Sequence, residues 1–270
     1  MQPIFSAIND AHRGLALDPP AVDNHFLSRA RRGLGRAQAA VSTRDTRIPL
    51  PPEAILSILT AAEASTAGLP ALRRASALSL TGLFAGRSDT SVHLRSEDVQ
   101  LTPDFIWLRL TEKGKRHRAV RRVVRLPLRQ RAIDGVASAV PRVAALLQRY
   151  FDAREEAGRT AEFAFQLGGE ARPTTTTQEQ WLATELAGIG VSAPPGFAYQ
   201  GHSLRSMGAS CMAAIGVDRH IYIWVGGWVR GSSVVDAHYV DPTVLPTPAA
   251  YALYGWALSR QYRAEAGVIP

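Results

Sequence analysis

Residues 105–127 read FIWLRLTEKGKRHRAVRRVVRLP. The segments 105–110 and 119–126 are rich in aromatic, aliphatic and β-branched residues, which favour strands. Between them, Glu112-Lys113-Gly114-Lys115 has the composition of a turn, and Pro127 ends the second segment. The pattern predicts a two-stranded antiparallel hairpin with a cationic tip.

Basic side chains concentrate in this hairpin. Nine Lys and Arg residues and no acidic residue occur from Lys113 to Arg131, in a chain of net charge +8 and sequence pI near 10.2. Of the 31 basic residues 29 are arginine, and both lysines, Lys113 and Lys115, are in the predicted tip. This clustering indicates contact with a polyanion such as nucleic acid, the alternative being a solvated basic edge strand.

Helical patterns surround the hairpin. The remaining sequence predicts a mainly α domain with a small antiparallel β-sheet, of the α+β class. Residues 1–40 have the pattern of two helices separated by a turn, and residues 42–52 that of a linker. Further predicted elements are a helix beginning at Pro52, a strand at 99–101, and helices at 70–84, 92–98, 136–158, 178–188, 201–225 and 249–263.

The composition excludes several classes of protein. With 270 residues, of which 46% are apolar and 20% charged, the chain is globular in composition and not disordered throughout. It has no apolar run long enough for a membrane span and no cationic, apolar secretory signal at its start. The lone cysteine, Cys211, gives no reason to expect an oxidising compartment, so we expect an intracellular protein that does not enter membranes.

Five elements occur in a fixed order along the chain. An arginine, Arg87, follows the glycine that ends a predicted helix, and the lysines of the hairpin tip follow it. A His-x-x-Arg sequence, His202 to Arg205, begins another predicted helix. Gly226-Gly227-Trp228 then precedes Tyr239 by eleven residues.

This ordered set resembles the catalytic domain of the tyrosine recombinases, the phage integrase family. The resemblance covers about residues 47–245, and residues 1–46 resemble the end of the family's helical, SAM-like core-binding domain with its linker. Residues 246–270 would form a C-terminal helical tail that is exchanged between protomers. The sequence around His202 and Trp228 is most similar to recombinases of eukaryotic mobile elements of the DIRS type.

The resemblance implies DNA recombination or integration through a covalent 3′-phosphotyrosine, without a metal or another cofactor. Tyr239 would be the nucleophile, and Arg87 and Arg205 would contact the non-bridging phosphate oxygens. Lys113, with Lys115 as the alternative, would protonate the leaving 5′-oxygen, and His202 would accept or relay the tyrosine proton. Trp228 takes a place often held by histidine and would donate a hydrogen bond without titrating.

The expected partners are double-stranded DNA and further copies of the chain in a tetrameric synapse. The localisation would be the nucleus for a eukaryotic mobile element, and otherwise the cytoplasm or nucleoid. The residues expected to hold the DNA backbone are Arg29, Arg32, Arg36, Lys115, Arg116, Arg118, Arg121 and Arg122.

Departures from the family pattern leave alternatives open. Thr90 occupies the place of the usual acidic residue, and the interval from Trp228 to Tyr239 is two residues longer than the commonest one. With most of the core-binding domain missing, this chain should bind DNA weakly and recombine poorly. The alternatives are a catalytically silent DNA-binding relic and a topoisomerase of type IB. The rival tyrosines, Tyr222, Tyr251 and Tyr254, have neighbours typical of packed residues.

Overall fold

A computed structural model of the chain describes residues 48–64, 66–113, 119–229, 231 and 233–258. All of them belong to one compact unit, residues 47–270. Residues 1–46, with the predicted core-binding remnant, lie outside the described residues. None of the described helices is both long and apolar enough to cross a bilayer.

The predicted hairpin is the main part of a three-stranded antiparallel sheet in the order β1-β2-β3. Its strands are β1 (Val99–Leu101), β2 (Phe105–Lys113) and β3 (Ala119–Pro127). Leu108 pairs with Val124 and Ile106 with Leu126, and these four side chains are buried. Because side chains alternate across a strand, the inner face is apolar and the outer face carries Trp107 and several arginines.

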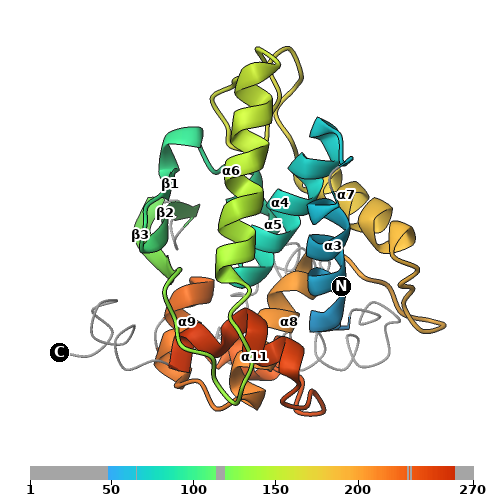
Figure 1. Cartoon of the computed structure of the whole chain (residues 1–270). Coiled ribbons are helices and arrows are strands. Elements are labelled where there is room, and N and C mark those ends of the chain that lie inside the picture. Colours follow the sequence, from blue (N-terminus) through green and yellow to red (C-terminus); the bar gives the residue numbers. More distant parts are fainter. Residues whose placement is uncertain (1–47, 65, 114–118, 230, 232, 259–270) are drawn as a thin grey trace, which may run out of the picture. The chain divides into compact units, whose positions relative to one another are not determined.

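Helices form the rest of the unit, as Figure 1 shows. Helix α4 is central and packs against α3, α6, α7 and α8, and nine consecutive residues of it, 75–83, are buried. The helical elements are α3 (Pro52–Glu63), α4 (Leu69–Leu83), α5 (Ser88–Val92), η1 (Ser96–Asp98), α6 (Val140–Glu156), α7 (Thr175–Gly188), α8 (Gly201–Ala214), α9 (Arg219–Gly226), α10 (Val234–His238), α11 (Pro248–Tyr254) and η3 (Gly255–Leu258).

Two helix predictions were wrong in detail. The helix predicted over 92–98 is instead α5, which ends at Val92, followed by the single turn η1. The continuous helix predicted over 201–225 is two helices, α8 and α9, separated at Gly216, whose φ of 78° ends α8. Asp218 then caps α9 by accepting a hydrogen bond from His220 N at 2.9 Å.

Residues 248–258 are core and not a separate tail. Leu253, Tyr254 and Trp256 are fully buried, and Tyr254 Oη donates to Gly82 O at 2.7 Å. Ala139 N also donates to Ala252 O. The domain boundary predicted at 245 therefore cuts through packed structure, and the part of the tail after Leu258 lies outside the described residues. The exchange of that part between protomers stays a prediction.

Candidate active site

Helix α8 carries two of the predicted site residues on its first turn. Gln200 and Ser203 form a reciprocal capping box that fixes the start of the helix at Gly201. His202 and Arg205 are three residues apart and therefore neighbours on the helix surface. His202 is exposed, whereas Arg205 is only 1% exposed.

Arg205 connects three separate segments. Its guanidinium carbon lies 3.7 Å from the centre of the Trp228 ring and 5.3 Å from that of Tyr239. Its Nη1 donates to Ala85 O at 3.0 Å and to Gly226 O at 2.5 Å. A buried guanidinium with these contacts fixes the positions of both backbone segments and of the Trp228 ring.

Tyr239 contacts the rings of both Trp228 and His202. Its ring centre is 5.3 Å from that of Trp228, edge to face, and 6.2 Å from that of His202, nearly parallel. The longer interval between Trp228 and Tyr239 thus does not separate the two residues. His202, Arg205, Trp228 and Tyr239 form one cluster, which we call the aromatic–arginine cluster.

The segment that carries Tyr239 is held on both sides. Val235 anchors α10 in the core, and Ser210 Oγ donates to Tyr239 O at 3.1 Å while accepting from Asp241 N at 2.8 Å. On the outer side, Arg219 of α9 donates to the Asp236 carboxylate. Sequence patterns identified neither Ser210 nor this ion pair as part of the site.

The rival tyrosines are in different environments. Tyr222 is buried and donates to Asp236 at 3.3 Å, and its pKa is raised by burial and then by the Asp236 charge. Tyr254 is fully buried, which raises its pKa well above the usual value. A phenol with a raised pKa is a weaker nucleophile at neutral pH. Tyr251 is half-buried and packs against the core.

The turn that carries Arg87 is pressed against α8. A Cβ on Gly201 would overlap the Ser88 side chain, and one on Gly208 would overlap Ala85. Gly201, Arg205 and Gly208 lie at helical spacing, so one face of α8 contacts the whole turn from Ala85 to Ser88. Ala85 itself has a φ of 47°, in the left-handed region.

The Arg87 side chain is half-buried, and it makes no hydrogen bond or ion pair with another residue of the described ranges. Its guanidinium donors are therefore available to a ligand. Arg205 holds the start of the same turn, because it donates to Ala85 O.

Comparison with solved structures identifies the fold that holds these residues. XerH site-specific recombinase bound to difH substrate superposes with a TM-score of 0.52 over 72% of this chain and 49% of that one, at 16% identity. XerA recombinase superposes with a TM-score of 0.52 over 79% of this chain and 66% of that one, at 19% identity. This chain has the tyrosine recombinase catalytic-domain fold. The predicted fold resemblance is confirmed.

A lambda integrase dimer bound to a core site gives a further match to the recombinase fold, with a TM-score of 0.50 over 74% of this chain and 50% of that one, at 16% identity. The chain spans about half the length of XerH and about two thirds of that of XerA. No protein-family model matches the chain. No curated protein matches it either. The similarity to the DIRS type stays a prediction.

The predicted proton donor of this recombinase fold, Lys113, is the last residue of β2, where its backbone pairs with Ala119. It lies three residues beyond Leu110, about 10 Å along the strand. Its side chain is outside what the structure describes, as is that of Arg121. The remaining predicted DNA contacts outside the described residues are Arg29, Arg32, Arg36, Lys115, Arg116 and Arg118.

Arg122 has a contact that the sequence prediction missed. It was predicted to hold DNA, but its Nη1 donates to Trp224 O at 3.0 Å and to Val225 O at 2.5 Å, at the end of α9. The alternation in β3 could have indicated this, because Arg122 shares the inward face with Val124 and Leu126.

Trp228 carries a polar atom in the cluster whose position suggests a ligand. The residue is 9% exposed, and its indole Nε1 is buried without a hydrogen-bond partner among the residues the structure describes. Buried N–H groups are normally satisfied, so this donor is suited to an acceptor that binds there. In the described ranges no three His, Cys, Asp or Glu side chains gather as metal ligands.

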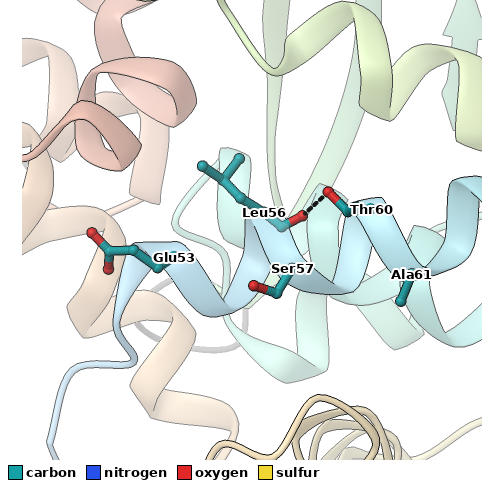
Figure 2. Close-up of a pocket in the computed structure, with 5 residues that line it drawn as sticks. All are labelled: Glu53, Leu56, Ser57, Thr60 and Ala61. Carbon is teal, nitrogen blue, oxygen red and sulfur yellow. Dashed lines mark hydrogen bonds between the residues drawn. The ribbon is translucent and has the colours of Figure 1, made fainter.

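A shallow pocket lies on a different element, along the outer side of α3 (Figure 2). It is lined by Glu53, Leu56, Ser57, Thr60 and Ala61, and Thr60 Oγ1 donates to Leu56 O at 3.0 Å. It contains none of the predicted site residues. The candidate site is therefore the aromatic–arginine cluster with the Arg87 turn.

Proposed function

We propose that this chain cleaves and rejoins DNA strands through a covalent 3′-phosphotyrosine formed on Tyr239. The observation that carries the proposal is the contact of Tyr239 with His202, Trp228 and Arg205 in a chain with the recombinase fold. Four side chains from α8, from the end of α9 and from the end of α10 meet there, in the combination needed for attack on a phosphodiester.

In the proposed reaction Tyr239 Oη attacks the phosphorus and the bond from phosphorus to the 5′-oxygen breaks. The tyrosine proton passes to His202, whose ring faces Tyr239. Lys113 at the hairpin tip gives a proton to the 5′-oxygen. The reverse sequence rejoins the strand, because the phosphotyrosine keeps the energy of the broken bond.

Charge develops on the non-bridging oxygens during the attack. The guanidinium groups of Arg205 and Arg87 stabilise it, and Trp228 Nε1 adds a hydrogen bond. A guanidinium keeps its charge at every physiological pH and has five donors, so it serves an anion better than a lysine would. Nucleophile, acid and charge stabilisation all come from side chains, and the proposal includes no metal or cofactor.

Double-stranded DNA is the proposed substrate, and a synaptic assembly of several copies the proposed active form. The basic hairpin supports the first statement, as do the solved structures of the same fold in which XerH is bound to its difH substrate and a lambda integrase dimer to a COC′ core site.

A covalent trapping assay tests the proposal without knowledge of the target site. The 270-residue chain is incubated with a pool of half-site duplexes whose recognition arms have random sequence. The cleaved strand carries a 5′ label, and its downstream piece is short enough to diffuse away. A labelled, SDS-resistant protein band is expected with the wild type and not with Tyr239→Phe.

The other outcomes favour the alternatives. An equal band with Tyr239→Phe would contradict the assignment of the nucleophile. Salt-dependent DNA binding with no band from any half-site would favour the silent DNA-binding relic. Relaxation of supercoiled plasmid without site preference would favour a topoisomerase.

A further inference from the structure

The C-terminal end of α9 is bound by two arginines from different elements. Arg122 of β3 donates hydrogen bonds to the carbonyls of residues 224 and 225, and Arg205 of α8 donates to the next carbonyl, that of Gly226. Three successive carbonyl groups, the last of which is two residues before Trp228, thus receive hydrogen bonds from guanidinium groups.

Arg122 reaches this place because of its register in the sheet. It pairs with Leu110, whose side chain is fully buried, and its own side chain points to the same inner face. Figure 1 shows α9 close to β3, as the two hydrogen bonds require. Arg125, three residues further along β3, has the opposite orientation and stacks on Trp107 at 4.2 Å.

The contact matters for charge as well as for position. The end of a helix carries a partial negative charge, which would repel a phosphate bound beside Trp228 and Arg205. A guanidinium on the same carbonyls offsets this charge and removes the freedom of the segment that carries Trp228. Neither effect requires Arg122 to touch the DNA.

We infer that Arg122 is a positioning residue for the cleavage reaction: it holds the end of α9 and so sets the places of Trp228 and Arg205 at the phosphate. The inference rests on the proposed function. It assigns Arg122 an effect on the rate of strand cleavage and little effect on DNA affinity, in contrast to a backbone contact.

The test compares three variants in the full chain. Arg122→Met removes the donors but keeps the apolar stem, Arg122→Lys keeps the charge with fewer donors, and Arg125→Met is the control on the other face of the same strand. The rate of covalent adduct formation is measured on half-site duplexes with protein in excess, and the DNA dissociation constant is measured separately at the same salt concentration.

We expect Arg122→Met to lower the single-turnover rate about 10- to 100-fold, with the dissociation constant within about twofold of the wild type. Arg122→Lys should be intermediate, about 3- to 10-fold below the wild type, and Arg125→Met within about threefold. A wild-type rate in Arg122→Met would overturn the inference, as would a change in DNA affinity alone. If Arg122→Met does not fold, a wild-type rate in Arg122→Lys would overturn it.

Amide hydrogen exchange on the free protein separates this inference from the proposed function. Residues 224–228 should exchange faster in Arg122→Met than in the wild type, whereas Arg125→Met should leave them unchanged. Without any adduct in the wild type the proposed function fails, yet the exchange result still reports on the contact. Unchanged exchange in a folded Arg122→Met protein would contradict the positioning role.

Discussion

The central guanidinium carbon of Arg205 lies 3.7 Å from the centre of the Trp228 ring, and both side chains contact the ring of Tyr239. Arg205 is 1% exposed, so the positive charge is held in the protein interior. A charge in this environment acts more strongly on a bound phosphate than an exposed one.

The two functions of the Trp228 ring, stacking and hydrogen bonding, can be separated. Trp228→Phe keeps an aromatic face for Arg205 and removes the N–H donor, so adduct formation should fall about 10- to 100-fold while the melting temperature changes little. Trp228→Ala should also destabilise the fold, by about 3–5 kcal/mol, because the ring is packed. Calorimetry and the trapping assay measure the two effects, and a fully active Trp228→Phe would exclude the indole N–H from catalysis.

The close contact of Gly208 in α8 with Ala85 predicts how substitutions of glycine change stability. Gly208→Ala forces a methyl group against Ala85 and should destabilise the protein by about 1–3 kcal/mol while shifting the Arg87 turn. Gly188→Ala at the end of α7 is the control, since nothing lies near its added Cβ, and it should be neutral or mildly stabilising. Urea unfolding measures both, and equal effects would contradict the close contact of α8 with the turn.

The Arg219–Asp236 pair predicts a dependence of stability on pH. Hydrogen bonds from Arg219 lower the Asp236 pKa below its usual 3.8, so the folded state favours the charged carboxylate. This contribution to stability is present above about pH 4 and is lost as the pH falls through the lowered pKa. Asp236→Asn should be less stable than the wild type at pH 6, with a smaller difference at pH 3. If urea unfolding gave the same difference in unfolding free energy between the wild type and Asp236→Asn at pH 6 and pH 3, the stabilising role of the charged Asp236 would be contradicted.

Burial of the single thiol predicts slow chemical modification. Cys211 is fully buried, and this raises its pKa to about 12. At pH 8 about one thiol in 10⁴ would be ionised, and the reagent would also lack access. A disulfide reagent such as Ellman's should therefore react within minutes in urea and much more slowly in the native protein. Rapid native reaction would show that α8 is not packed as described.

The C-terminal region predicts two different results for two truncations. Removal of residues 246–270 takes Leu253, Tyr254 and Trp256 out of the core and should prevent stable folding. Removal of residues 259–270 alone should leave the melting temperature within a few degrees and reduce assembly on DNA, if this segment is the one exchanged. Sedimentation with and without DNA distinguishes the results, and unchanged assembly would count against exchange.

Sequence patterns predicted the hairpin, most helices and the members of the cluster, because these depend on local alternation and on the order of unusual residues. They did not predict that Arg205 is buried or that Arg122 is half-buried against α9. Charged residues usually lie at the surface, and only the packing of α8, α9 and β3 turns these two onto backbone carbonyls. Residues 248–258 were mistaken for a tail because their apolar pattern fits an intermolecular contact as well as a core.

The most direct measurement of the central claim is mass spectrometry of the trapped adduct. After nuclease digestion and proteolysis, the wild-type chain should yield one peptide with a nucleotide attached through a 3′-phosphate, and fragmentation should place this mass on Tyr239. Attachment to Tyr222, Tyr251 or Tyr254, or to a residue other than tyrosine, would contradict the proposed site.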